Sequence, residues 1–182
     1  MIPRLLLLLG LLLLPLAAAA RDGGACGDLG PVPDAVQVAW VSPLTKTVGA
    51  GSWLDVVRVA DLRSYLSGKG VTPLRLLQAL GVVNGKGRGR AAKKSYKVTI
   101  FDVRSTWLCR PLRSGAADKV VSGVAICAPR QQEGTRRSFT GCGYTRDTVT
   151  GGRGLDTFKV RWRDASSGGF CVLPLERFAK GA

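Results

Sequence analysis

From Tyr96 to the C-terminus, apolar and polar residues alternate in short runs. The runs cover residues 96–103, 120–128, 138–144, 157–163 and 169–175. Alternation with a period of two is typical of β-strands that bury one face. The stretches between these runs are rich in Gly, Ser, Asp and Arg, which favour turns. Strands joined in succession by short polar turns predict a mainly antiparallel sheet, and the spacing leaves open whether this sheet tends towards a barrel or a sandwich.

Ahead of this region, the sequence predicts two more strands and two short helices. Residues 36–40 alternate and residues 52–60 form an apolar run, so each is expected to be a strand. Asp61 can cap a short helix that ends at Gly68. Thr72 and Pro73 are typical of a helix start, and Gly81 is placed to end that helix. The expected fold class is therefore α+β, with the helices covering a sheet.

Two helices joined by a glycine-containing turn also suggest a helix-turn-helix. The second helix offers only Arg75 and Gln78 as polar side chains that could read DNA bases. A DNA-binding role is therefore rejected, and the predicted export signal agrees, because an exported protein does not meet chromosomal DNA.

The N-terminus has the layout of a secretory signal peptide. Arg4 precedes a leucine run at residues 5–14, and an alanine-rich cleavage site ends at Ala20. The apolar run is about ten residues long, whereas a membrane-spanning helix needs about twenty. The sequence thus predicts a signal peptide at residues 1–20, a Gly/Pro-rich leader at residues 21–35 and a single globular domain at residues 36–182. The expected location is periplasmic or secreted, without a membrane anchor in the exported chain.

Five cysteines would enter this oxidising compartment, where disulfides persist. The candidates for structural disulfides, which all lie between residues 109 and 171, are Cys109, Cys127, Cys142 and Cys171. Cys26 in the Gly-rich leader is the one expected to be free or intermolecular. No C-x-x-C spacing and no histidine occur, so no metal site is predicted.

The net charge of +15 indicates an anionic partner, and the densest basic segment lies at residues 86–97. Its cations are Lys86, Arg88, Arg90, Lys93, Lys94 and Lys97. Interspersed glycines would let this segment fold closely onto an anion, although a solvated connection explains it equally well. The segment is no phosphate-binding loop, because Gly87 stands where that loop needs Ser or Thr.

A second basic feature is the predicted strand at residues 157–163. Period-two alternation places Lys159, Arg161 and Arg163 on one face, about 6.8 Å apart. Such a ladder would suit a linear polyanion. The arginines that could widen it are Arg136, Arg137, Arg146 and Arg153. A charged strand face of this kind also serves simply to keep a sheet edge solvated.

Catalysis is poorly supported by the residues present. Without histidine there is no Ser-His-Asp or Cys-His pair, and the carboxylates are scattered singly. Asp102 is the weak catalytic candidate, because it stands in an otherwise apolar strand beside Arg104. A paired structural acid explains it better.

The function that the sequence favours is an exported, non-enzymatic protein without a cofactor. Its anionic partner would be an envelope polymer, an acidic glycan or an acidic protein, with nucleic acid met only outside the cell and contact with a membrane surface left open. The alternatives are a structural component of a bacterial envelope or secretion assembly and, third, a hydrolase that works without histidine.

Overall fold

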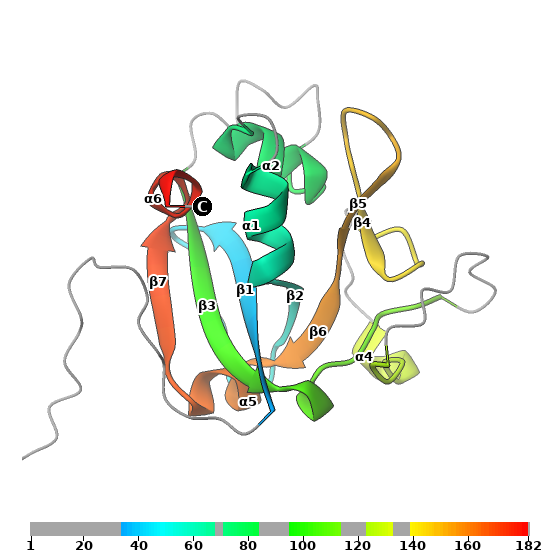
Figure 1. Ribbon diagram of the computed structural model, residues 1–182. Helices are drawn as coiled ribbons and strands as arrows, with labels where there is room; N and C mark the ends of the chain where they lie inside the picture. The colour runs from blue at the N-terminus through cyan, green and yellow to red at the C-terminus, as the bar shows by residue number, and fades with distance from the viewer. Residues whose placement is uncertain (1–33, 68–70, 84–94, 114–122, 133–138, 182) are drawn as a thin grey trace, which may run out of the picture.

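The computed structural model describes residues 34–67, 71–83, 95–113, 123–132 and 139–181. Its main element is a five-stranded antiparallel sheet in the order β6-β2-β1-β3-β7 (Figure 1). The strands are β1 (Ala35–Pro43), β2 (Trp53–Arg58), β3 (Tyr96–Arg104), β6 (Phe158–Arg161) and β7 (Phe170–Pro174). The predicted antiparallel sheet is confirmed, and within the described residues it does not close into a barrel.

Strands β1 and β3 form the centre of the sheet and pair along their whole length, from Ala35 opposite Arg104 to Pro43 opposite Tyr96. Alternation divides their side chains between two cores. Val98 and Ile100 of β3 belong to one buried cluster, and Phe101 and Val103 belong to the other. A central strand can supply two cores only if both faces of the sheet are covered.

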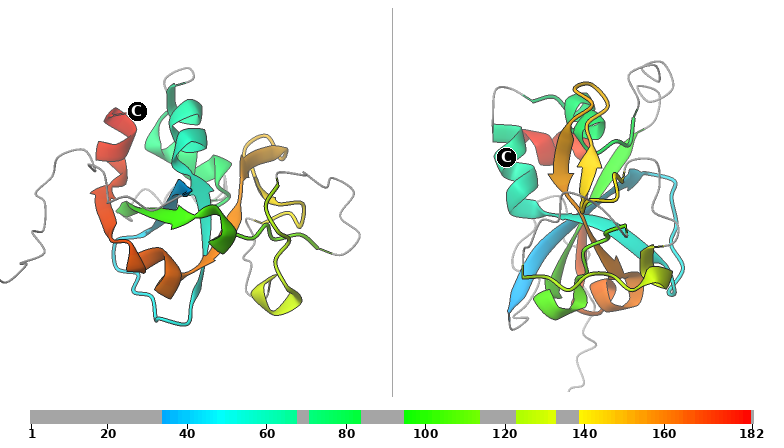
Figure 2. Two further views of the ribbon diagram at one scale, coloured as in Figure 1. Left: turned by 60° about the horizontal axis from the view of Figure 1, so that its bottom comes forward. Right: turned by 90° about the vertical axis from the view of Figure 1, so that its right-hand side faces the viewer.

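Helices cover both faces. The first cluster packs against α1 (Val59–Ser67), α2 (Pro73–Ala79) and α6 (Leu175–Lys180), and this side is called the α1 face. The second packs against α5 (Trp162–Ser167), and this side is called the α5 face. In both views of Figure 2, α5 lies at the end of the molecule away from α1, α2 and α6.

The two predicted helices are present, with one shifted start. Thr72 caps α2 as predicted, because its side-chain oxygen accepts a hydrogen bond from the Arg75 amide at 3.2 Å. Gly81 follows α2 with a φ of 63°, as expected of a glycine at a helix end. Helix α1 begins at Val59, so Asp61 lies in its first turn, where a negative charge favours the helix dipole, and is not the cap.

Two predicted strands in the C-terminal half are shorter or missing. The described part of the 120–128 run forms only a bridge between Ile126 and Arg110, and α4 (Pro129–Gln132) follows it. In the 138–144 run, Gly141 and Gly143 have φ values of 92° and 81°, outside the range of a regular strand. The strand β4 (Tyr144–Arg146) therefore begins only after them.

Strand β4 pairs with β5 (Arg153–Asp156) to form a two-stranded ribbon. Only Thr157 separates β5 from β6, so the ribbon rises from the edge of the main sheet (Figure 1). The predicted 157–163 strand ends at Arg161, where α5 begins. Helices α5 and α6 and the short 3-10 helix η2 (Ser105–Trp107) were not predicted from the sequence.

Candidate anion-binding surface on the ribbon of β4 and β5

The first basic segment lies largely outside the described residues, which include none of Lys86, Arg88, Arg90, Lys93 and Lys94. Its last member, Lys97, lies in β3 and is half-buried. The Lys97 ammonium donates a hydrogen bond to the backbone carbonyl of Lys46 at 3.4 Å. By alternation, Lys97 shares the α5 face with Phe101.

The predicted cationic ladder is not formed. Arg163 lies in α5, so only Lys159 and Arg161 are in the strand. These two point to the α1 face, because Phe158 and Val160 of the same strand belong to the core of the α5 face. The prediction failed because it assumed that the cationic side of the strand faces solvent, whereas the Lys159 side chain is only 2% exposed.

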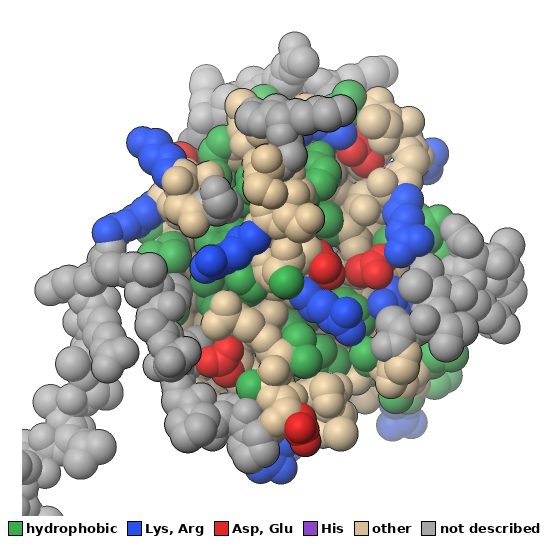
Figure 3. Space-filling view, in the orientation of Figure 1, with side chains coloured by type: hydrophobic (Ala, Val, Ile, Leu, Met, Phe, Trp, Pro, Cys, Tyr) green, Lys and Arg blue, Asp and Glu red, His purple; other side chains and the backbone are tan. Residues whose placement is uncertain are grey.

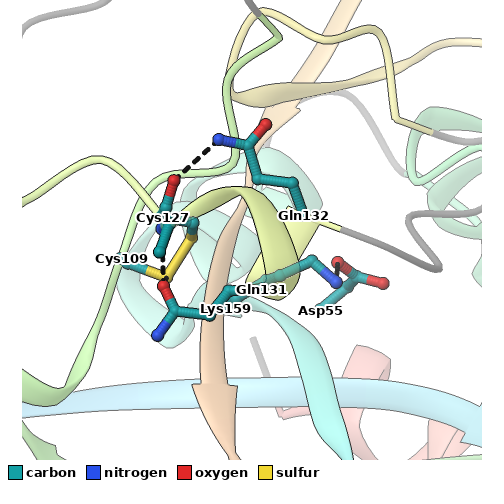
Figure 4. Close-up of a disulfide and its surroundings, with 7 residues drawn as sticks. Asp55, Cys109, Cys127, Gln131, Gln132 and Lys159 are labelled. Carbon is teal, nitrogen blue, oxygen red and sulfur yellow. Dashed lines mark hydrogen bonds and ion pairs between the residues drawn. A yellow bond between two sulfur atoms is a disulfide. The ribbon is translucent and has the colours of Figure 1, made fainter.

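Lys159 is buried beside the disulfide of Cys109 and Cys127 (Figure 4). Its ammonium lies 3.3 Å from a carboxylate oxygen of Asp55, the residue directly opposite it on β2. The backbone of Cys109 pairs with that of Lys159 and covers this edge of β6. The side chain of Gln131 accepts a hydrogen bond from the Ala128 amide in the turn next to the disulfide. This corner of the sheet is therefore a structural unit with its charge paired internally.

The other two members of the predicted ladder also have neighbours. The guanidinium of Arg161 lies over the ring of Trp53, 5.3 Å from its centroid, and Trp53 is the residue opposite it on β2. The Arg163 side chain is 69% exposed and lies 3.6 Å from Asp164. Lys97 lies three strands away from β6 in the sheet order and on the other face, so the structure does not bring the two basic features together.

The cysteines follow the prediction in part. Cys109 and Cys127 form a disulfide with an S–S distance of 2.05 Å, and Cys171 is disulfide-bonded as well. The prediction for Cys142 is wrong, because its thiol is free. The backbone of Cys142 forms a β-bridge with Leu112, so the residue opposite it is not a cysteine. Cys26 lies outside the described residues.

The surface that does concentrate exposed arginines is the ribbon of β4 and β5. Its turn is ordered by Asp147, whose carboxylate accepts hydrogen bonds from the amides of Val149 and Thr150 at 2.8 and 3.1 Å. Asp147 also forms an ion pair with Arg75 of α2. Burial raises the pKa of Asp147, but the hydrogen bonds from Arg75 and the two amides outweigh it and leave the pKa lowered.

The ribbon is seated on the end of α2 by further contacts. The hydroxyl of Thr145 donates to the carbonyl of Ala79 at 2.7 Å, and that of Thr148 donates to the carbonyl of Val83 at 2.7 Å. A side chain at Gly154 would place its Cβ 2.1 Å from the Ala79 oxygen, so only glycine allows this approach. The position of the ribbon arginines is thus fixed by the helix below.

Arg146 and Arg153 are opposite each other in the register of the ribbon. Residues in such a pair share one face, and like charges there are destabilising. Arg146 is held by a hydrogen bond from its Nε to the Gly151 carbonyl at 3.3 Å. Arg153 lies over the ring of Tyr144 and also binds Asp156 at 2.6 Å. Both side chains are exposed, so a ligand in solvent can reach them while these contacts are kept.

A third arginine lies buried at the base of the ribbon. Arg110 donates to the Gly143 carbonyl at 3.0 Å, lies 3.6 Å from Asp156, and has its guanidinium 4.6 Å from the Phe158 ring centroid. Burial lowers the pKa of Arg110 and Asp156 raises it, while Arg58 and Arg153 lower it further. The ribbon surface is defined here as the exposed Arg113, Arg146 and Arg153 with the buried Arg110 beneath them.

Arg113 completes this surface through its contact with Gly141. A Cβ at Gly141 would lie 2.8 Å from the Arg113 Cδ, and one at Gly143 would lie 2.8 Å from the Arg110 Cδ. The two glycines therefore let the two arginines lie directly on the backbone. Sequence reasoning named Arg146 and Arg153 only as an extension of the ladder and missed Arg110 and Arg113, although the Gly-Cys-Gly stretch was a signal of close backbone approach.

Acidic side chains in the described part of the chain are mostly used internally. Asp55, Asp147 and Asp156 form ion pairs with arginine or lysine, and only Asp34 and Glu176 are exposed. The exposed cations are Arg63, Arg104, Arg113, Arg130, Arg146, Arg153, Arg163, Arg177 and Lys180. Figure 3 shows basic side chains spread over much of one face, with acidic ones interspersed among them. The surface formed by the described residues is therefore more basic than the composition alone indicates.

The weak catalytic candidate, Asp102, is buried in β3 and accepts a hydrogen bond from Gln37 at 3.2 Å. Gln37 is its cross-strand neighbour on β1, so this geometry is that of a paired structural acid. In the ranges that the structure describes, no three side chains of His, Cys, Asp or Glu gather in a way that could hold a metal ion.

Comparison with protein-family models, with curated proteins and with solved structures finds no match for this chain. Among the described residues, no helix has both the length and the apolar character needed to cross a membrane.

Proposed function

We propose that this chain is an exported, non-enzymatic protein that binds an anionic partner, with the ribbon surface as a contact site. The observation that carries the proposal is the pair Arg146 and Arg153, two exposed arginines directly opposite each other on a ribbon that is held in place by α2. Like charges placed opposite each other favour the binding of an anion from solvent, in addition to the Asp156 carboxylate that Arg153 already contacts.

Arginine is suited to such an anion because its planar guanidinium can donate two parallel hydrogen bonds to a phosphate, sulfate or carboxylate group. The strands of a ribbon lie about 4.8 Å apart, so one oxyanion can contact both guanidinium groups. Arg113, which lies against Gly141 ahead of β4, adds a third exposed guanidinium to the surface. A partner with repeated negative charges therefore fits better than a single small ion.

The charge of the whole chain supports a polymeric partner. A net charge of +15, with nine exposed cations and two exposed acids in the described residues, creates a positive field that concentrates polyanions. The partner class is an anionic envelope polymer, an acidic glycan or an acidic protein. The basic segment with Lys86, Arg88, Arg90, Lys93 and Lys94 remains a proposed second contact.

An extracytoplasmic location is part of the proposal. The disulfide of Cys109 and Cys127 supports it, because such bonds persist in oxidising compartments. The predicted signal peptide at residues 1–20 gives the route. Mass determination of the N-terminus of exported protein would test whether cleavage follows Ala20.

The proposal is tested by retention on a heparin column at about 0.15 M salt. The triple variant Arg113→Gln, Arg146→Gln and Arg153→Gln is compared with a control triple, Arg63→Gln, Arg177→Gln and Lys180→Gln, which removes the same charge from α1 and α6. We expect the ribbon triple to elute at clearly lower salt than the control. The ribbon triple should also show a shallower dependence of log K for heparin binding on log salt, because it has lost contacts that release counterions.

Equal elution of the two triples would contradict a role for the ribbon, and no retention of the parent chain would contradict polyanion binding altogether. In the second case, co-purification of protein partners from membranes at high salt would favour the alternative of an assembly component. A variant with glutamine at the five basic positions of residues 86–94 tests that segment separately.

A further inference from the structure

We propose that the α5 face of β1, β3 and β7 holds a second binding site, for a single-chain anionic amphiphile. This face is formed by three rows of side chains that run across the strands. The row nearest α5 contains Phe101 opposite Phe170, the middle row contains Trp40, Thr99 and Val172, and the outer row contains Ser42, Lys97 and Pro174. The site is independent of the ribbon, which lies beyond the other edge of the sheet.

Two buried hydroxyl groups lie on this face. Ser42 is 2% and Thr99 is 1% exposed, and neither side-chain oxygen has a hydrogen-bond partner among the described residues. In the sheet register, Ser42 and Thr99 are diagonal neighbours on adjacent strands. Buried hydroxyl groups without a partner are rare in folded proteins, because each loses its hydrogen bonds to water. Two of them side by side indicate a bound group with oxygen or nitrogen atoms.

Two lysines supply positive charge next to these hydroxyls. Lys97 is directly opposite Ser42, and its ammonium lies 3.4 Å from the carbonyl of Lys46. The Lys46 ammonium lies 5.8 Å from the centroid of the Trp40 ring. In the sheet register Trp40 is directly opposite Thr99, so both lysines lie near the two hydroxyls. The polar part of the site therefore suits an oxyanion that accepts hydrogen bonds.

The margin of the same face is apolar and open. Phe170 is 47% and Val172 is 46% exposed, and both belong to the edge strand β7. Leu44, which follows Pro43 at the outer end of β1 and pairs with Ser95, is 49% exposed. Residues on one strand face repeat about every 6.8 Å, so the strip from Phe170 to Pro174 extends for about 14 Å. Its length and its apolar composition suit a hydrocarbon chain.

The combination of hydroxyls, lysines and an apolar strip on one face distinguishes between classes of ligand. A bare phosphate would leave the apolar strip unused. A sugar usually stacks on an exposed aromatic ring, but Trp40 is only 8% exposed and Lys46 lies over it. A site with an apolar lining and a few polar groups is typical of small-molecule binding. The ligand that uses every part of the face has a carboxylate or phosphate head for Lys97, Ser42 and Thr99 and an acyl tail for Val172 and Phe170.

The test compares three probes with the same tail below their micelle-forming concentrations: dodecanoate, dodecyl maltoside and dodecyltrimethylammonium. Calorimetry on the oxidised chain gives affinity and stoichiometry. Changes in the amide chemical shifts of Thr99 and Val172 show whether the probe binds at this face. We expect one dodecanoate per chain at this face, with much weaker binding of the other two. Affinity should rise about fourfold for each two carbons added to the tail, half the effect of full burial because the strip is half-exposed.

Matched variants separate this site from the general charge of the protein. Lys97→Gln should weaken dodecanoate binding about tenfold, because a charge-assisted hydrogen bond is lost, whereas Lys180→Gln, an equal charge change on α6, should alter it less than twofold. Thr99→Val tests the same site with a residue of similar shape and should weaken binding about threefold. Neither Lys97→Gln nor Thr99→Val should change heparin retention more than Lys180→Gln does.

Several outcomes would overturn the proposal. Equal binding of dodecyl maltoside would show that the head group is not recognised, and equal effects of the two lysine variants would show only general charge attraction. If Thr99→Val changes stability but not affinity, the hydroxyls hold a buried water. Binding only to vesicles that contain anionic phospholipid, without saturable binding of dodecanoate, would assign the face to a membrane surface.

Discussion

Two pairs of antiparallel strands present their cations in opposite ways. On β2 and β6, Lys159 is opposite Asp55 and Arg161 is opposite Trp53. On the ribbon, Arg146 is opposite Arg153. Cross-strand neighbours determine whether a charge is satisfied within the fold. The comparison shows that the cations of a basic strand indicate a binding surface only when they are exposed, and that this depends on the residues opposite them.

The largest effect is expected from displacing Arg110, the buried arginine beneath the ribbon. Gly143→Ala should lower the free energy of unfolding by about 3 kcal/mol, because the new Cβ meets Arg110 and the φ of 81° is strained for alanine. Gly151→Ala is the control, since its φ is 72° but its Cβ would meet nothing, and about 1 kcal/mol is expected. Urea unfolding measures both. Equal losses would mean that the contact with Arg110 does not contribute to the free energy of unfolding.

The second prediction concerns the pair on β2 and β6. Asp55→Ala should lower the free energy of unfolding by about 2 kcal/mol, because it leaves the buried ammonium of Lys159 without its carboxylate. The loss is below that of a fully buried pair, since Asp55 is 38% exposed. Asp164→Ala removes the neighbour of the exposed Arg163 and should cost less than about 0.5 kcal/mol. A larger loss for Asp164→Ala would reverse the assignment of structural and exposed cations.

The third prediction concerns the pH dependence of the ion pair between Asp147 and Arg75, which holds the ribbon on α2. Because the pKa of Asp147 is lowered in the fold, its ion pair with Arg75 contributes stability above about pH 4 and loses it as the pH falls through the lowered pKa. The Asp147→Asn variant should be less stable than the parent by about 1 to 2 kcal/mol at pH 6. The difference should shrink towards pH 2 in thermal unfolding. A difference that stays constant with pH would mean that the charge of Asp147 is not involved.

The smallest change in stability is expected from reversing one charge of the ribbon pair. Arg146→Glu turns the like-charge pair on the ribbon into an opposite-charge pair, as found for Asp55 and Lys159. It should raise the free energy of unfolding by about 0.5 kcal/mol while it lowers heparin retention. Arg63→Glu on α1 makes the same charge change without an opposed arginine and serves as the control. A loss of stability in Arg146→Glu would show that the two arginines do not repel each other in the free protein.

The sequence predicted the parts of the fold that depend on local pattern. The alternation around Val98 and Phe101 gave the central strand, and Thr72 with Pro73 gave the start of α2, because capping acts within one turn. The end of β6 at Arg161 was missed, since the "FKVRWR" stretch alternates without a break and the helix that follows depends on packing of Trp162 against Trp40 and Phe101.

The candidate site was harder to predict because its members come from distant parts of the chain. Arg110 and Arg153 meet only because the segment after β3 runs beside β6, and both arginines approach Asp156 at the end of β5. Sequence spacing carries no information on such an approach, and it also hides that Lys159 is buried. The glycines at positions 141 and 143 were the available signal, since they mark a backbone that another segment contacts closely.

The central claim is that polyanions bind at the ribbon surface and not over the whole basic exterior. Arginine modification by phenylglyoxal, with and without a bound heparin oligosaccharide and read by peptide mass spectrometry, tests it residue by residue. We predict strong protection of Arg113, Arg146 and Arg153 and little protection of the equally exposed Arg63 and Arg177. Uniform protection of all five, or protection of the last two alone, would contradict the claim.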